Sequence, residues 1–294
     1  MKSDLGLGLV QAGGKLSYFD GIAPQYYKDI LRKALRAGLR SFDSAYTYQN
    51  ADELLCSVLK EQHIQREEYD ITTKIMPLPT FKKKSEISLK RLGLDYFDNL
   101  LIHWPTHDEK LLFSTLKTLE KLKEEGKCIN IGVSNFPFSL LSRVCKDFEI
   151  NILERSYSLL WTKEIEETKH LGIKLFGYAP LGEGLLSGKY YYPEDLNDNR
   201  KNLWVFRNLE LYHQLLFEVE EISKKYNVSM VEVALAFSRS ESFDKIFIGV
   251  SKINQLDIFS STFTLNEDEI NKLKILSDKL CELNLTDNIY EHRW

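Results

Sequence analysis

The sequence has few of the residues from which disulfide frameworks and metal centres are built. Its 294 residues include only four cysteines and six histidines. No two cysteines form a CxxC pair, and the histidines show no HExxH spacing. We therefore expect Cys56, Cys128, Cys145 and Cys281 to be reduced thiols, and we expect no metal site.

Long apolar runs and an excess of basic charge are missing as well. No apolar run approaches the roughly 18 residues of a membrane span, and the N-terminus lacks the apolar stretch of a signal peptide. The formal net charge is −4, and the densest basic cluster, Lys82–Lys84, fits the solvated start of a helix. These absences predict a cytoplasmic protein with neither a membrane nor a nucleic acid as its partner.

Short apolar segments alternate with amphipathic ones along the whole chain. Eight segments are typical of buried strands: Leu5–Val10, Leu39–Asp43, Tyr69–Lys74, Asn99–His103, Ile129–Ser134, Ile150–Glu154, Ile173–Tyr178 and Lys245–Val250. Helical patterns occupy Tyr26–Ala37, Ala51–Glu61, Glu109–Glu125, Pro137–Cys145, Trp161–His170, Leu209–Lys225, Ser229–Ser238, Asn254–Ser261 and Glu267–Leu280. The alternation predicts an α/β fold, a (β/α)8 TIM barrel with extra C-terminal helices, with a doubly wound sheet as its rival. Because no Pro/Gly/Ser linker interrupts residues 1–294, we expect a single domain.

Polar residues stand where several apolar strands end. Asp43 ends the second strand, Tyr48 lies just beyond it, Lys74 ends the third and His103 ends the fourth. In a (β/α)8 barrel these strand ends meet on one rim, where the active site lies. Each residue alone fits an ordinary structural role, but the set of four indicates a catalytic site.

The chemistry of these four side chains suits carbonyl reduction. A phenol has a pKa near 10, and a neighbouring ammonium lowers it. A carboxylate paired with Lys74 keeps that lysine charged and aimed. His103 can polarise a substrate carbonyl by hydrogen bonding, so the set predicts Tyr48 as a general acid or base.

Three motifs around these residues resemble the aldo-keto reductase superfamily. The stretch from Phe42 to Tyr48 resembles its FDTAxxY signature, Thr73-Lys74 resembles its strand-three lysine, and Leu101–Pro105 resembles its LLHxP element. The resemblance implies that Tyr48 is the proton donor, that Lys74 and Asp43 tune it, and that His103 orients the carbonyl. It spans Leu5 to about Leu256.

Two further motifs of the resemblance concern a nicotinamide cofactor. Gly132–Phe136 is similar to GxSNF, which implies that Ser134 and Asn135 hold the carboxamide. Tyr178–Lys189 is similar to YSPLGxGxLxGK, which implies that Tyr178 stacks on the nicotinamide ring. The loop residues of that motif would lie along the pyrophosphate: Leu181, Gly182, Gly184 and Lys189. Neither glycine cluster has the GxGxxG spacing of a Rossmann domain.

The sequence departs from the family pattern at Glu154, where relatives usually carry Gln. An ionised Glu only accepts hydrogen bonds and would place negative charge near the nicotinamide. Our hypothesis is that Glu154 favours the oxidised cofactor or stays protonated through burial; a neutral replacement that keeps one hydrogen bond fits equally well. A second departure is Gln49, which replaces the glycine after the catalytic Tyr and either reaches the pocket or caps a helix.

The element that resembles the 2′-phosphate site lacks the usual arginine. Ser251 and Lys252 stand at the helix start, Gln255 lies within the helix, and Phe259 takes the position of the usual Asn. A lysine at a helix N-terminus can hold a phosphate but lacks the fork of Arg. We therefore expect NADP(H) as the cofactor, with NAD(H) use left open.

The expected substrate is a small aldehyde or ketone, or the corresponding alcohol. Tyr46, Met76 and Trp104 are the candidate pocket residues, and they suit a substrate with an apolar part. The Tyr190–Asn202 loop and the tail ending at Trp294 are further candidates for its border.

Two alternatives stay open. One is a cofactor-binding regulatory protein of the same fold with slow turnover, which Glu154 and the missing arginines favour. The other is a metal-dependent barrel enzyme, for which the strand ends lack ligands. The sequence identifies neither the physiological direction nor the oligomeric state.

Overall fold

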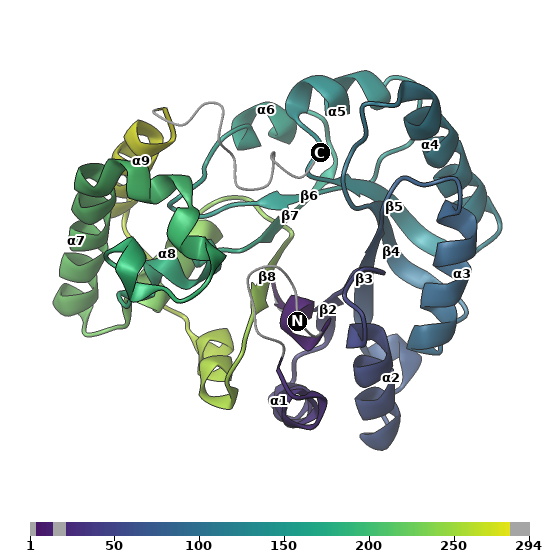
Figure 1. The fold of residues 1–294 in the computed structure, drawn as a ribbon, viewed down its shortest axis with the longest axis horizontal. Coiled ribbons are helices and arrows are strands. Elements are labelled where there is room, and N and C mark those ends of the chain that lie inside the picture. The colour runs from purple at the N-terminus through teal and green to yellow at the C-terminus, as the bar shows by residue number, and fades with distance from the viewer. Residues whose placement is uncertain (1–3, 14–21, 283–294) are drawn as a thin grey trace.

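A computed structural model describes residues 4–13 and 22–282 of the chain. Its strands close into a parallel barrel in which each strand pairs with its neighbour in sequence and β8 pairs with β1 (Figure 1). The strands are β1 (Leu5–Gly8), β2 (Ser41–Asp43), β3 (Asp70–Ile75), β4 (Phe97–Ile102), β5 (Cys128–Ser134), β6 (Ile152–Ser156), β7 (Lys174–Tyr178) and β8 (Lys245–Gly249). The predicted (β/α)8 barrel is therefore confirmed, and the doubly wound rival is excluded.

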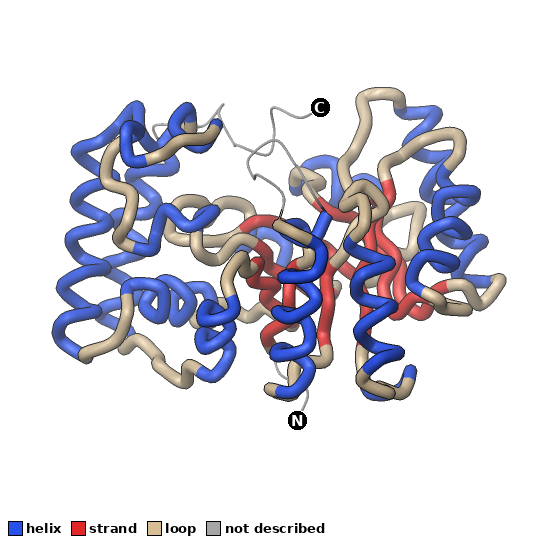
Figure 2. The backbone as a smooth tube through the Cα atoms, turned by 60° about the horizontal axis from the view of Figure 1, so that its bottom comes forward, coloured by secondary structure: helices blue, strands red, loops and turns tan. Residues whose placement is uncertain are grey.

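Helices surround the strands on the outside of the barrel (Figure 2). The α-helices are α1 (Pro24–Arg36), α2 (Ala51–Glu61), α3 (Phe81–Leu92), α4 (Glu109–Glu124), α5 (Phe138–Val144), α6 (Ile165–Lys169), α7 (Leu209–Tyr226), α8 (Met230–Arg239) and α9 (Glu267–Glu282). Short 3-10 helices are η1 (Val10–Gly13), η2 (Arg66–Glu68), η3 (Gly182–Ser187), η4 (Pro193–Asp195), η5 (Asn199–Asn202), η6 (Trp204–Asn208) and η7 (Ile253–Ser260). The expectation of one domain over residues 1–294 stays a prediction.

Two expected helices differ in the structure. Only Ile165–Lys169 of the segment 161–170 is α-helical, because Ser158 and Trp161 exchange backbone hydrogen bonds of 2.9 and 3.1 Å and close a tight turn. Trp161 is buried in the core, which agrees with a packing role. The segment 254–261 forms the 3-10 helix η7 instead of an α-helix.

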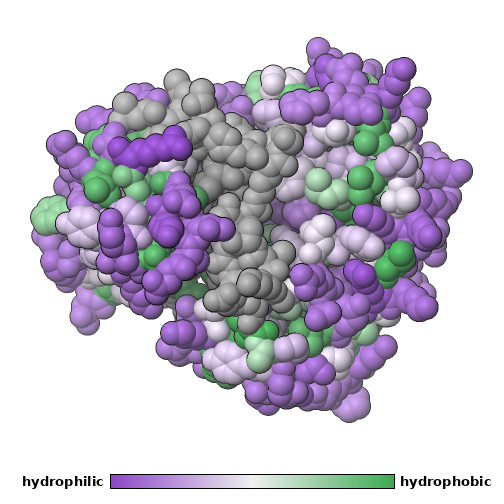
Figure 3. Space-filling model, viewed as in Figure 1, coloured by the Kyte–Doolittle hydropathy of each residue, from purple (hydrophilic) through white to green (hydrophobic). Residues whose placement is uncertain are grey.

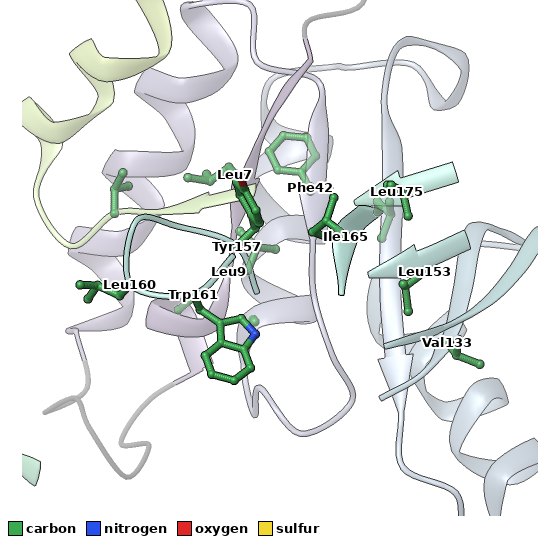
Figure 4. Packing of buried hydrophobic residues seen from close by; sticks show 14 of the residues in the cluster. Leu7, Leu9, Phe42, Val133, Leu153, Tyr157, Leu160, Trp161, Ile165 and Leu175 are labelled. Atoms are coloured by element: carbon green, nitrogen blue, oxygen red, sulfur yellow. The ribbon is translucent and has the colours of Figure 1, made fainter. Parts of the chain in front are cut away.

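The larger hydrophobic core lies between the barrel strands and the surrounding helices. Figure 4 shows Leu7, Phe42, Leu153 and Leu175 projecting from different strands into this core. Because side chains alternate along a strand, the neighbours of these residues point into the barrel instead. Burial of this apolar surface, at about 25 cal/mol per Å², is the main source of folding free energy.

The barrel interior is layered by polarity. At the N-terminal end of the strands, Lys245 Nζ donates to Asp70 (2.5 Å) and to Ser41 Oγ (2.7 Å). The next layer is apolar and is formed by Leu101, Ile152, Phe176 and Phe247. Above it, toward the C-terminal ends, lies a second charged layer. The apolar layer separates the two groups of charges.

The exposed surface is largely hydrophilic around the edge of the face in Figure 3, where hydrophobic residues are scattered. Within residues 4–13 and 22–282, no helix is long and apolar enough to cross a membrane.

A buried aspartate joins the segment after β2 to two helices. Asp52 of α2 accepts hydrogen bonds from Ser44 Oγ (2.6 Å) and from Ser88 Oγ of α3 (2.9 Å). Burial raises the pKa of Asp52 from its ordinary 3.8 to about 6, against the lowering effect of both hydroxyls. The network fixes the chain that leads from β2 to Tyr48.

We predict that the free energy of unfolding falls by about 2 kcal/mol between pH 4.5 and pH 7.5 because of Asp52. The folded protein binds a proton at this carboxyl more tightly than the unfolded chain does, so stability falls as pH rises from about 4 to about 6. Denaturant titrations of wild type and Asp52→Asn at both pH values measure the difference. The exposed Asp95→Asn variant should keep the wild-type dependence; the same pH dependence in Asp52→Asn would contradict the prediction.

Gly132 of β5 allows close packing inside the barrel, because a Cβ there would lie 2.3 Å from Ile152 O and 2.7 Å from Leu101 Cδ2. We predict that Gly132→Ala lowers the free energy of unfolding by about 1–3 kcal/mol. Gly8→Ala is the matched control, since its Cβ would have no contact closer than 3.5 Å. Equal denaturation midpoints for the two variants would refute the packing argument.

Candidate active site

The charged layer at the C-terminal ends of the strands is centred on Lys74. Its Nζ contacts Asp43 Oδ1 from β2 and lies 2.8 Å from Glu154 Oε1 of β6. The exposed fractions of the Lys74, Asp43 and Glu154 side chains are 2%, 6% and 1%. The expected Asp43–Lys74 pair is therefore present, and Glu154 joins it as a second carboxylate. Sequence reasoning missed this contact.

The two carboxylates keep Lys74 charged. Burial alone would lower its pKa, but the negative charges of Asp43 and Glu154 outweigh burial and raise the pKa above its usual value. Burial, reinforced by the charge of Glu154, raises the pKa of Asp43 well above its ordinary value despite the attraction of Lys74. One buried ammonium thus faces two carboxyl groups that compete for it.

Tyr48 and His103 lie next to this layer. Their ring centroids are 5.9 Å apart in an edge-to-face arrangement, and Lys74 Nζ lies 5.8 Å from the centroid of the Tyr48 ring. Both side chains are half-buried. The backbone holds them in place: Tyr46 N donates to Lys74 O (2.9 Å), and His103 N donates to Ile75 O (2.9 Å). All four predicted catalytic residues are therefore brought together.

Gly13 supports the backbone of Tyr48 from the η1 side. A Cβ at Gly13 would lie 2.5 Å from Tyr48 O and 2.9 Å from Tyr48 Cα, so only glycine fits without displacing this loop. Sequence reasoning missed Gly13, because 35 positions separate it from Tyr48 and no spacing pattern links them. Gln49 follows with φ of +41°, a left-handed conformation that glycine adopts more readily than glutamine does. The Gln49 side chain is exposed. Gln49 lies two positions before Ala51, the first residue of α2.

A polar network joins the ends of β5 and β7. The Tyr178 hydroxyl donates to Asn135 Oδ1 (2.6 Å). Asn135 Nδ2 donates to Ser134 Oγ (3.0 Å) and to His103 O (3.1 Å). The residues expected at the carboxamide therefore lie together and connect directly to the strand end that carries His103.

The glycine-rich loop after β7 has an unusual backbone. Gly182, Glu183, Gly184 and Gly188 all have positive φ, between +53° and +89°. Leu181 is half-buried and Lys189 is exposed. The glycines carry no side chain, and close approach of a loop backbone to a phosphate requires this.

The long loop after Tyr190 folds back onto the glycine-rich loop. Arg200 Nη1 donates to Glu183 O (2.8 Å), and the guanidinium lies 5.0 Å from the Tyr190 ring centroid. Arg200 is also paired with Asp198 (2.7 Å). Sequence reasoning missed Arg200, which lies in an irregular segment with no motif.

The segment expected to contact a 2′-phosphate is capped by its own glutamine. Gln255 Oε1 accepts from Ser251 N (2.7 Å), from Lys252 N (3.0 Å) and from Ser251 Oγ (3.2 Å). Lys252 is exposed, and Phe259 is half-buried against the core. The cap occupies the two backbone N–H groups that would otherwise face an anion.

The expected pocket residues have different surroundings. Trp104 is buried beside His103, with ring centroids 6.3 Å apart, and Met76 is half-buried just after β3. The ring of Tyr46 packs against α3, with Lys84 Nζ at 4.9 Å and Arg91 at 4.7 Å from its centroid. The tail ending at Trp294 lies outside the described residues.

Metal ligands do not gather anywhere in the part of the chain that the structure describes. No group of three or more His, Cys, Asp or Glu side chains there is placed to hold a metal ion. Carboxylates and an ammonium make up the buried charged layer instead.

Known proteins with similar sequences are aldo-keto reductases of several kinds. Glyoxal reductase of Bacillus subtilis is 30% identical over 258 residues, covering 84% of this chain and 82% of the relative. The 9,11-endoperoxide prostaglandin H2 reductase of Trypanosoma cruzi is 29% identical, covering 84% of this chain and 81% of the relative.

Solved structures share the fold. The glycerol dehydrogenase of Gluconobacter oxydans has a TM-score of 0.79 at 21% identity and covers 94% of this chain and 92% of its own. An aldo/keto reductase of Brucella melitensis has a TM-score of 0.72 at 23% identity, covering 93% and 94%.

The family model of the aldo/keto reductases matches residues 4–278, which include every strand of the barrel and the whole charged layer. The motifs that carried the resemblance lie within this match. This chain therefore belongs to the aldo/keto reductase family, whose members are oxidoreductases of carbonyl compounds.

Proposed function

We propose that this protein interconverts a small aldehyde or ketone and the corresponding alcohol, with Tyr48 as the group that gives and takes the proton. The observation that carries the proposal is the position of Tyr48 and His103, edge to face, beside the buried ammonium of Lys74. A phenol, an imidazole and a fixed positive charge at one rim suit proton transfer to a carbonyl oxygen.

Each of the four side chains has a distinct role in the proposed reaction. Tyr48 donates its hydroxyl proton to the substrate oxygen during reduction and accepts it during oxidation. Lys74 stabilises the phenolate that remains, and Asp43 keeps Lys74 charged and oriented. His103 donates a hydrogen bond to the carbonyl oxygen and polarises the C=O bond, so that negative charge developing on oxygen is stabilised.

The residues present fit a nicotinamide cofactor, which supplies the hydride when bound. Ser134 and Asn135 form a connected polar group beside the catalytic rim, suited to a carboxamide, and Tyr178, whose hydroxyl donates to Asn135, would stack on the nicotinamide ring. The loop that would lie along a pyrophosphate carries Gly182 and Gly184 in a positive-φ conformation that other residues rarely adopt. Of the expected phosphate ligands, Lys252 has an exposed side chain, whereas the backbone N–H groups beside it are held by Gln255. We therefore propose NADP(H) as the cofactor. The preference for NADP(H) over NAD(H) should be smaller than in a site with arginine.

Small carbonyl compounds are the proposed substrate class. The relatives reported above include a glyoxal reductase and a glycerol dehydrogenase. Trp104 and Met76, beside the catalytic residues, supply apolar contact surface for a short carbon chain. Glyoxal and glycerol are accordingly the first compounds to assay in the two directions.

A cofactor-binding protein with slow turnover is the second candidate. The 2.8 Å contact between Glu154 and Lys74 favours it, because a second carboxylate reduces the positive potential that Tyr48 experiences. The turnover number distinguishes the two candidates: values near or above about 1 per second support the enzyme.

We predict that Tyr48→Phe lowers kcat by about 10²–10⁴-fold, because it removes the proton donor and leaves the ring in place. The affinity for NADPH, followed by quenching of tryptophan fluorescence, should stay within about twofold of wild type. Tyr96→Phe is the control, since Tyr96 precedes β4 at the opposite end of the barrel. Reductase activity that survives Tyr48→Phe undiminished would overturn the assignment.

We predict that Lys252→Ala weakens NADPH binding by about five- to tenfold and leaves NADH binding unchanged. The physical reason is that only NADPH carries the 2′-phosphate that the ammonium would attract. Fluorescence titrations with both cofactors measure the two dissociation constants, and Lys121→Ala of α4 controls for loss of an exposed positive charge. Equal weakening of NADPH and NADH would contradict a phosphate contact.

A further inference from the structure

The buried charged layer holds more negative than positive charge. Lys74 supplies one ammonium, whereas Asp43 and Glu154 supply two carboxyl groups, all of them nearly inaccessible to water. An uncompensated buried charge is costly, so such a site gains a proton or a cation whenever it can. The question is where the compensating charge comes from.

The surrounding strands carry two further cations, Arg155 and Lys245, and each is paired with another carboxylate. The titratable groups nearest the layer are Tyr48 from the segment after β2, His103 after β4, and Tyr178 from β7, whose phenol also experiences the charges of Glu154 and Glu183. β5, the neighbour of β6, contributes Ser134 opposite Glu154.

Arg155 follows Glu154 in the strand but is paired with Glu164 at 2.8 Å. Lys245 lies beyond the apolar layer and is paired with Asp70.

Only one of the two carboxylate oxygens of Glu154 contacts Lys74. Oε1 contacts Lys74, and Oε2 is buried without a donor among the described residues, while the Glu154 and Asp43 carboxyls lie close enough for a hydrogen bond that adds to burial in raising the pKa of Asp43. Two buried carboxyl groups in contact, with no further donor for the free oxygen, indicate a proton on the carboxyl pair.

We propose that Asp43 and Glu154 share one exchangeable proton, and that the positively charged ring of the oxidised nicotinamide replaces it. Binding of the oxidised cofactor then releases this proton to solvent, whereas the reduced cofactor, whose ring is neutral, binds without releasing it. The inference rests on the proposed function, because it requires the nicotinamide to lie beside Tyr178.

The competition between the carboxyl groups supports this assignment. Burial and the charge of Glu154 raise the pKa of Asp43, so this carboxyl holds a proton at higher pH than an isolated aspartate does. The proton belongs to the pair and not to either residue. Lys74 stays charged throughout, since both carboxyls raise its pKa.

The test measures proton release on cofactor binding. Isothermal titration of the full chain with NADP⁺ and with NADPH, in phosphate and in Tris at the same pH, gives the number of protons released with each cofactor. We expect NADP⁺ to release up to one proton more than NADPH. We also expect the Kd for NADP⁺ to fall by up to about tenfold for each unit by which the pH rises, because binding releases a proton. The Kd for NADPH should lack this dependence. NADPH controls for titration of the shared 2′-phosphate.

Glu154→Gln keeps the shape of the side chain and removes the charge. We expect this variant to lose the excess proton release and to bind NADP⁺ at least about tenfold more weakly relative to NADPH. Glu154→Asp, which keeps the carboxylate, should restore part of the pH dependence. A role of Glu154 in packing alone would change both cofactor affinities equally and leave the proton count the same.

The outcomes separate this inference from the proposed function. Binding of both cofactors by wild type with equal proton release would overturn the shared proton and leave the oxidoreductase proposal intact. Proton release that persists unchanged in Glu154→Gln would also overturn it. Binding of neither cofactor would overturn the proposed function and the inference together.

Discussion

The ammonium of Lys74 is the charge around which the site is organised. An isolated ammonium buried among strands would lose several kcal/mol of hydration free energy, and it stays charged only because carboxylates contact it. Those carboxylates come from β2 and β6, on different sides of the barrel. The site therefore depends on closure of the sheet: strands that are far apart in an open sheet face each other across the interior of a barrel. The apolar layer below keeps this charge apart from the Lys245–Asp70 pair.

Placement of Tyr48 depends on a second set of contacts, outside the barrel interior. Gly13 lies against its backbone, and Asp52 holds Ser44 of the same connection through a hydrogen bond of 2.6 Å. Tyr46 N is bonded to Lys74 O, so the connection that carries the phenol is tied to the strand that carries the ammonium. The strand residues fix where the charge lies, and the connection fixes where the phenol lies. The proton transfer proposed for Tyr48 requires both positions to be held together.

Much of this arrangement could be predicted from the sequence, because the carboxyl ends of parallel strands must meet at one rim. That rule alone brought Asp43, Lys74 and His103 together. The contact between Glu154 and Lys74 could not be predicted, since it crosses the barrel from β6 to β3 and depends on how the strands are staggered. The tight turn at Trp161 was missed because its apolar pattern fits a helix equally well, and tertiary packing decided between them. Gly13 was missed because close backbone contact leaves no spacing signal.

The charge of Glu154 acts on the two charges that the proposed carbonyl reduction would create. That reaction would leave a positive nicotinamide ring and a negative Tyr48 phenolate, and a nearby carboxylate would stabilise the first and destabilise the second. The contacts decide which effect is larger. Glu154 Oε1 is paired with Lys74, so the ammonium offsets the repulsion that the phenolate experiences. Oε2 has no donor among the described residues, so its charge would act on a cationic ring once the proton proposed to be shared with Asp43 has left. In the proposed reaction, Glu154 would therefore stabilise the oxidised cofactor more than it raises the proton affinity of Tyr48, so it would assist hydride donation to the carbonyl and delay release of the oxidised cofactor.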